Sequence, residues 1–169
     1  MFIDKVLIGT SELRRLKYTL NIPLILEGSV WLKTMLPYND IIIGDVDAIT
    51  KPDYINILKN EGYNVDNTMA EKVINDVTID IFHNTGNIIV NDSDFDNFLA
   101  SHDLYFARQL DKICAFNSHM NEYKWKLIPS LINIYQYISN FDINTQAVVN
   151  RFYDKKYMKE KLNTLFNAD

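Results

Sequence analysis

Residues 22–49 read IPLILEGSVWLKTMLPYNDIIIGDVDAI, and this stretch decides the fold. The run Ile22–Leu26 is short, apolar and rich in β-branched and leucine side chains, which is typical of a buried strand. It leads to Gly28 and Ser29, and Ser29 is a suitable N-cap for a helix over Val30–Leu36. The first half of the stretch therefore predicts a strand, a tight turn and a helix.

The second half of the stretch predicts another buried strand, residues 45–49, that carries two carboxylates. Side chains alternate between the two faces of a strand, so Asp45 and Asp47 project from the same face. Val46 and Ala48 then point the other way, into a core. Such an acid pair either forms a site on that face or lies on an exposed strand face or turn.

A third acid follows in a predicted hairpin. Two predicted strands, residues 72–74 and 77–82, flank Asn75-Asp76, a pair that favours a two-residue turn. In the second strand, Asp80 lies on the face opposite Val77, Ile79 and Ile81. If the two acidic strands are neighbours, three carboxylates converge and repel one another. A divalent cation removes that repulsion, and oxygen-only ligands suit Mg²⁺ or Mn²⁺.

The turn at Gly28 and Ser29 supplies the complementary part of a site. A strand that ends in Gly-Ser and opens a helix presents free backbone N–H groups and the positive end of the helix dipole. Lys33, one turn later on the same predicted helix, is positioned either to reach a phosphate or to lie on a solvated face. A triphosphate would fit between this turn and the carboxylates Asp45 and Asp47.

The remaining elements complete a mixed α/β pattern. We expect a first helix capped near Thr10-Ser11 and running through Leu20, and a helix from Pro52 to Gly62. A short strand at 88–90 and a helix from Asp92 through Leu99 follow, and the pattern is helical after residue 101. The sequence thus predicts an α/β domain over 1–100 and a helical C-terminal subdomain over 101–169.

Composition and charge narrow the class of protein. The chain has 169 residues, a formal net charge of −5 and an isoelectric point of about 5.1, which argues against broad coating of DNA. Its one cysteine, Cys114, excludes an internal disulfide. We find no apolar run long enough to cross a bilayer and expect a cytoplasmic protein with no membrane partner. The sequence leaves the oligomeric state open.

Taken in order, these motifs resemble the DNA polymerase β-like nucleotidyltransferase superfamily, especially its minimal members and its aminoglycoside nucleotidyltransferase branch. The resemblance covers residues 22–90. It implies a mixed β-sheet flanked by helices, with Gly28 and Ser29 as the family's Gly-Ser pair and Asp45 and Asp47 as its metal-binding pair. Asp80 matches the third carboxylate, which in the family is a general base or a further metal ligand. The chain from Ser29 to Asp45 is longer than is usual in the family, and we expect a loop at 37–40 to hold the surplus.

The resemblance implies a transferase that moves a nucleoside monophosphate from a nucleoside triphosphate to an acceptor hydroxyl and releases pyrophosphate. The acceptor class stays open among a protein side chain, an RNA end and a small molecule, because family members serve toxin–antitoxin, phage-related and antibiotic-resistance systems. Two other functions compete with this one. The chain could be a nucleotide-binding module without turnover, or a metal-dependent nuclease that uses the same three acids.

Overall fold

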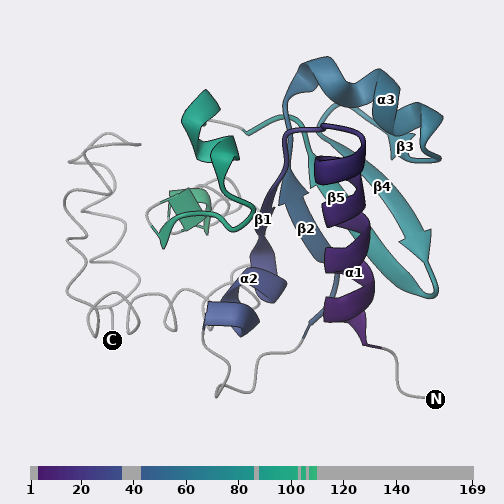
Figure 1. The fold of residues 1–169 in the computed structure, drawn as a ribbon, viewed down its shortest axis with the longest axis horizontal. Coiled ribbons are helices and arrows are strands. Elements are labelled where there is room, and N and C mark those ends of the chain that lie inside the picture. The colour runs from purple at the N-terminus through teal and green to yellow at the C-terminus, as the bar shows by residue number, and fades with distance from the viewer. Residues whose placement is uncertain (1–3, 36–42, 86–87, 103, 106, 110–169) are drawn as a thin grey trace, which may run out of the picture. The chain divides into compact units, whose positions relative to one another are not determined.

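The computed structural model describes residues 4–35, 43–85, 88–102, 104, 105 and 107–109 (Figure 1). The described residues fall into two units, one containing those up to Thr85 together with Asn91–Ala100, the other containing 88–90 and those from Ser101 on. Within the described part of the chain, no helix has the length and apolar character needed to cross a membrane. The expected loop at 37–40 and the C-terminal segment from residue 110 lie outside the described residues.

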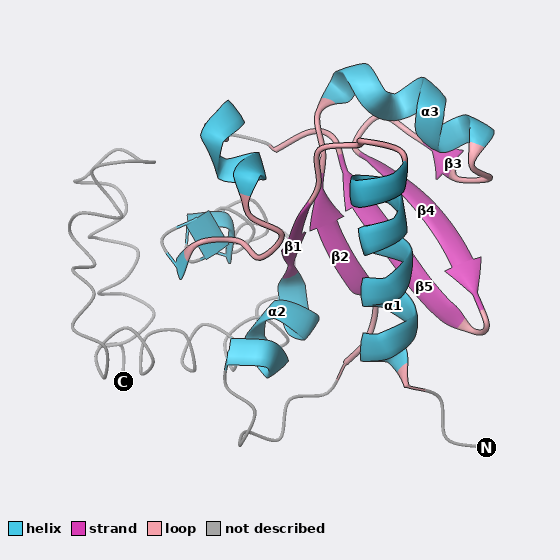
Figure 2. Cartoon of the chain, viewed as in Figure 1, coloured by secondary structure: helices cyan, strands magenta, loops and turns pink. Residues whose placement is uncertain are grey.

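The first unit is built on one mixed five-stranded sheet (Figure 2). Its strands in chain order are β1 (Ile25–Glu27), β2 (Val46–Ile49), β3 (Asn64–Val65), β4 (Met69–Ile74) and β5 (Val77–Phe82). Their order in the sheet is β1-β2-β5-β4-β3. The central pair β2–β5 is parallel, and the other pairs are antiparallel. This confirms that the two acidic strands are neighbours.

The first strand is shorter than predicted and shifted toward the C-terminus. We expected Ile22–Leu26, whereas β1 begins at Ile25 and includes Glu27. Pro23 has no N–H group to donate to a strand ladder, so regular pairing cannot begin before it. The Pro23 carbonyl instead accepts a 2.7 Å hydrogen bond from the Thr50 hydroxyl.

The helices are α1 (Lys5–Arg14), α2 (Gly28–Met35) and α3 (Ile55–Asn60), with short 3₁₀ turns at Pro52–Tyr54 and Asp92–Asp96. The predicted cap at Thr10-Ser11 is wrong, because α1 begins earlier. The Asp4 carboxylate accepts a 3.0 Å hydrogen bond from the Leu7 N–H and caps the first turn. A π-helical turn, Arg15–Thr19, then extends α1 almost to the predicted end.

Helix α1 covers the apolar face of the sheet, where it packs on β2 and β5 (Figure 1). Val46, Ala48, Ile79 and Ile81 project into this core, as their alternation predicted. The helix approaches closely at Gly9, where an added Cβ would lie 2.6 Å from Val46 Cγ1. One face of the sheet is thus sealed by apolar packing, and the polar residues of β2 and β5 are left on the other face.

The predicted hairpin is confirmed in detail. Asn75 and Asp76 both have positive φ, 49° and 65°, as a two-residue turn of type I′ requires, and the turn pairs Ile74 with Val77. This tight turn fixes the register of β4 against β5. Every residue of β4 therefore has a defined partner on β5, the strand that carries Asp80.

Two predictions after residue 85 are wrong. Residues 88–90 form no strand, and the expected helix from Asp92 through Leu99 ends as the 3₁₀ turn at Asp96. The chain then extends along β1, where Leu26 N–H donates to the Phe98 carbonyl at 2.6 Å and Ala100 N–H donates to the Leu26 carbonyl at 3.1 Å. These bonds to the sheet edge compete with helix formation. In the second unit, residues 102, 104, 105 and 107–109 are helical.

Candidate active site

A row of carboxylates crosses the sheet at one level. The strand register places Glu27 of β1 opposite Asp47 of β2, Asp47 beside Asp80 of β5, and Asp80 opposite Glu71 of β4. Residues paired in this way project from the same face of a sheet. Four adjacent strands therefore each contribute one acid to the face opposite α1.

Asp45 joins this row from just outside β2. It is exposed and lies two residues before Asp47, and its side chain reaches the carboxyl of Asp80. The three acids predicted from the sequence, Asp45, Asp47 and Asp80, therefore lie together around the Asp80 carboxyl. Glu71 approaches the same carboxyl from the other side.

Asp80 is a buried acid within this row. Its side chain is buried, with 6% exposure, and among the described residues no donor contacts its Oδ1 atom. Burial raises the pKa of Asp80 to about 8, with further contributions from the Glu71 and Asp45 side chains and from the negative charge of Asp47. A buried carboxylate without a donor is costly, so this position calls for a proton or a cation.

The turn before α2 lies directly against the acidic row. Gly28 has a φ of 75°, and a Cβ there would lie 3.0 Å from Asp47 Cβ and would contact Asp47 Oδ2. Glycine is therefore required both by the backbone conformation and by the proximity of the carboxylate. The structure thus joins the Gly-Ser turn to the acid pair, as a shared site requires.

Ser29 and Lys33 both lie on α2 and are half-buried. The helix begins at Gly28, one residue before the predicted cap, so Ser29 belongs to its first turn. The N–H groups of this turn have no acceptor within the helix. They form the electropositive end of α2 next to Asp47, while Lys33 lies one turn farther along.

The donor set fits a hard divalent cation in its chemistry. Within the described residues, no group of three His, Cys, Asp or Glu side chains closes around a single point as a metal centre does. Oδ1 of Asp80 is nevertheless buried without a donor, and further carboxylates lie beside it. A bound Mg²⁺ or Mn²⁺ would offset their negative charge. All the available ligands are oxygen atoms, which disfavours zinc.

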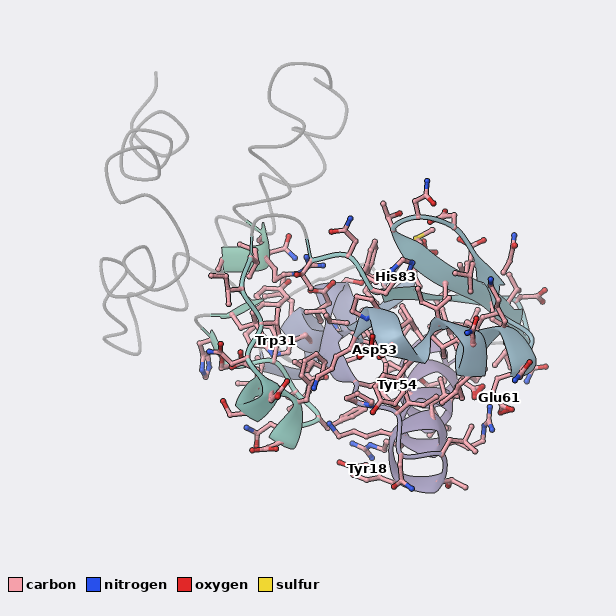
Figure 3. The ribbon with its side chains drawn as sticks, turned by 90° about the horizontal axis from the view of Figure 1, so that it is seen from above. Tyr18, Trp31, Asp53, Tyr54, Glu61 and His83 are labelled. Atoms are coloured by element: carbon pink, nitrogen blue, oxygen red, sulfur yellow. The ribbon has the colours of Figure 1, made fainter. Side chains whose placement is uncertain are left out.

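His83, the histidine nearest to Asp80 in the sequence, contacts the turn between β3 and β4. Its Nε2 lies 2.8 Å from the Asp66 carbonyl, a distance at which the Nε2–H tautomer donates, and the ring is buried past the end of β5 (Figure 3). Its backbone N–H donates to the Thr68 carbonyl at 3.0 Å. These contacts hold the turn between β3 and β4.

Sequence reasoning missed two acids of the row, Glu27 and Glu71. Glu71 could have been found, because a two-residue turn at Asn75-Asp76 places it opposite Asp80 by counting alone. Glu27 could not, because its place in the row depends on how β1 pairs with β2. It is fully buried at the end of β1, immediately before Gly28.

Comparison with known proteins places the fold. No protein-family model and no curated protein sequence matches the chain. The structure is similar to the solution structure of the antibiotic-resistance factor ANT(2'')-Ia, an aminoglycoside nucleotidyltransferase. The TM-score is 0.54 at 12% identity, and the match covers 96% of this chain and 92% of that chain. The fold is nucleotidyltransferase-like. This confirms the predicted fold class.

Proposed function

We propose that this chain is a nucleotidyltransferase that moves a nucleoside monophosphate from a nucleoside triphosphate to an acceptor hydroxyl. The observation that supports the proposal best is the contact between the Gly28 turn and Asp47, with Asp47 in register beside Asp80. A group that binds phosphate and a group that binds cations are thereby adjacent. The nucleotidyltransferase-like fold is consistent with the same chemistry.

Each residue of the site has a proposed task. The first-turn N–H groups of α2 at Gly28 and Ser29, with the Ser29 hydroxyl and the Lys33 ammonium, bind the triphosphate. Asp45 and Asp47, with Asp80, would hold Mg²⁺ or Mn²⁺, which when bound neutralises the charge of the phosphates and favours their alignment. All six residues were predicted from the sequence, and their roles remain proposals.

Asp80 and the Gly28 turn have separate tasks in the proposed reaction. Asp80 accepts the proton of the acceptor hydroxyl, whose oxygen forms a bond to the α-phosphorus. The bond from the α-phosphorus to the oxygen that bridges to the β-phosphate breaks, and pyrophosphate leaves with that electron pair. The turn at Gly28 holds the triphosphate in line for this displacement.

The acceptor enters from the Asp80 side of the site in this arrangement. Its class is a protein side chain, an RNA end or a small hydroxyl compound. The similar structure is that of an antibiotic-resistance factor. A small-molecule antibiotic with free hydroxyl groups is therefore one acceptor to include beside protein and RNA.

The test is transfer of label from α-³²P nucleoside triphosphates. Each of the four ribonucleotides is incubated with Mg²⁺ or Mn²⁺ and with cell-lysate protein, total tRNA or an aminoglycoside. We expect label in one acceptor class with the wild-type chain and a loss of at least a hundredfold with Asp47→Asn. Asp53→Asn is the matched control, because Asp53 is an exposed acid in the 3₁₀ turn before α3 (Figure 3).

The competing functions give different results in the same assay. Nucleotide binding without labelled product supports a binding module. Shortened RNA in the absence of added triphosphate supports a nuclease. Transfer by Asp47→Asn at the wild-type rate would contradict the proposed site.

A further inference from the structure

An extended segment, Phe98–Ala100, holds the outer edge of β1. It runs parallel to the strand, with Leu99 paired to Leu26. The Leu26 N–H donates to the Phe98 carbonyl at 2.6 Å, and the Ala100 N–H donates to the Leu26 carbonyl at 3.1 Å. We call this segment the brace. It engages β1 two residues before Gly28, so it fixes the strand side of the turn.

The same segment also holds the helix side of the turn, through Trp31. This residue lies on α2 three positions after Gly28, and its side chain is buried, with 2% exposure (Figure 3). Its indole Nε1–H donates to the Ala100 carbonyl at 2.7 Å. The Ala100 carbonyl is therefore hydrogen-bonded to Trp31 of α2, and the Ala100 N–H to Leu26 of β1. These two partners lie on either side of Gly28 in the sequence.

The brace is itself anchored at its N-terminal end. The Lys17 ammonium donates to the carbonyls of Leu24 and Phe95, both at 2.7 Å, and to that of Asn97 at 3.3 Å. The Lys17 side chain therefore links the residue before β1 to the residues before the brace. A segment held in this way cannot shift without moving β1.

We propose that Trp31 is a positioning residue that sets the phosphate-binding turn through its hydrogen bond to Ala100. The inference rests on the proposed function, because it assigns the turn to the triphosphate. Gly28 is conformationally free, and its position depends on the relative placement of β1 and α2. The Trp31–Ala100 bond fixes that placement and so directs the N–H groups of Gly28 and Ser29 at the phosphates.

The experiment removes the hydrogen bond while keeping the ring. In Trp31→Phe the indole N–H is lost, and replacement of Trp31 by β-(3-benzothienyl)alanine removes the N–H with almost no change of volume. Two quantities are measured for each full-length variant. They are the Kd for a non-hydrolysable ATP or GTP analogue with Mg²⁺, and amide hydrogen exchange in peptides containing Leu26 and Ala100. Leu58→Val is the matched control, since Leu58 is a buried core residue of α3 remote from the turn.

We expect both Trp31 variants to weaken analogue binding about tenfold and to accelerate exchange at Leu26 and Ala100 about tenfold, the effect of one buried hydrogen bond. In a working transfer assay, KM for the triphosphate rises by the same factor while kcat changes by less than about threefold. Leu58→Val should lower stability without changing Kd.

Each of the remaining outcomes contradicts the proposed role of Trp31. Unchanged exchange in the benzothienyl variant overturns the brace, whatever happens to binding. Faster exchange with an unchanged Kd shows that the bond is structural only and overturns the positioning role. An equal loss of affinity in Leu58→Val also overturns it. If the wild-type chain binds no nucleotide, the proposed function fails and this inference fails with it.

Discussion

Replacing Asp80 by asparagine should stabilise the cation-free protein, and the gain should grow with pH. Burial and the neighbouring acids raise the pKa of Asp80 to about 8, from 3.8 in an unfolded chain. Between these values the folded chain holds a proton that the unfolded chain has lost. The carboxyl therefore costs stability progressively as the pH rises from about 4 to about 8. Asparagine has nearly the same shape and does not titrate, so Asp80→Asn removes this cost.

The size of the effect follows from the shift. About four pKa units at about 1.4 kcal/mol each give a ceiling of about 6 kcal/mol. Asp45 and Glu71, which contribute to the shift, are exposed and screened by water, so we expect roughly 2 kcal/mol. The free energy of unfolding of Asp80→Asn, taken relative to that of the wild type, should therefore be roughly 2 kcal/mol larger at pH 8 than at pH 4.5.

Urea unfolding in EDTA, followed by tryptophan fluorescence at pH 4.5, 6.5 and 8, measures this difference. Trp31 is a suitable reporter because it is buried. Asp76→Asn at the exposed hairpin turn is the control, and its difference from the wild type should stay constant with pH. A constant difference for Asp80→Asn as well, or a variant less stable than the wild type at pH 8, would refute the electrostatic reasoning.

Three further substitutions test the packing around the site. Gly9→Ala should lower the free energy of unfolding by about 1–3 kcal/mol, because the new methyl group overlaps Val46, and a raised Tm in a thermal melt would contradict this. Gly28→Ala should abolish binding of a nucleotide analogue in a titration, since its Cβ contacts the Asp47 carboxylate, and retained affinity would show that the turn does not carry the phosphates. Lys17→Met should cost about 1–3 kcal/mol in chemical unfolding, because it removes the ammonium that bridges three carbonyls, and an unchanged midpoint would show that these bonds contribute nothing.

Local signals predicted the part of the fold that carries the acids. Alternation in β2 and β5 gave the correct faces for Val46 and Asp47, and the Asn75-Asp76 pair gave a correct hairpin. These features depend on neighbouring residues and are readable without the rest of the chain. The sequence predicts the adjacency of β2 and β5 only as a condition and does not predict their parallel direction, because no local pattern specifies which strands become neighbours across the sheet.

The wrong helix after Asp92 and the missed acid Glu27 both depend on contacts between distant segments. The stretch from Asp92 to Leu99 has acids suited to begin a helix, but its last residues bond to Leu26, far away in the sequence. Glu27 joins the acidic row because β1 includes it and pairs it with Asp47 of β2, a register that no local pattern specifies. A shift of one residue changes the face that a side chain occupies, so such acids are hard to assign from sequence.

A double-label transfer assay tests the central proposal most directly. The wild-type chain and Asp47→Asn are incubated with triphosphate labelled at either the α- or the γ-phosphate, together with the acceptor class found first. We predict that α-label enters the acceptor, that γ-label leaves in pyrophosphate, and that both events require Asp47. Transfer of the γ-label to the acceptor, or transfer of the α-label without Asp47, would contradict a nucleotidyltransferase built on this acidic row.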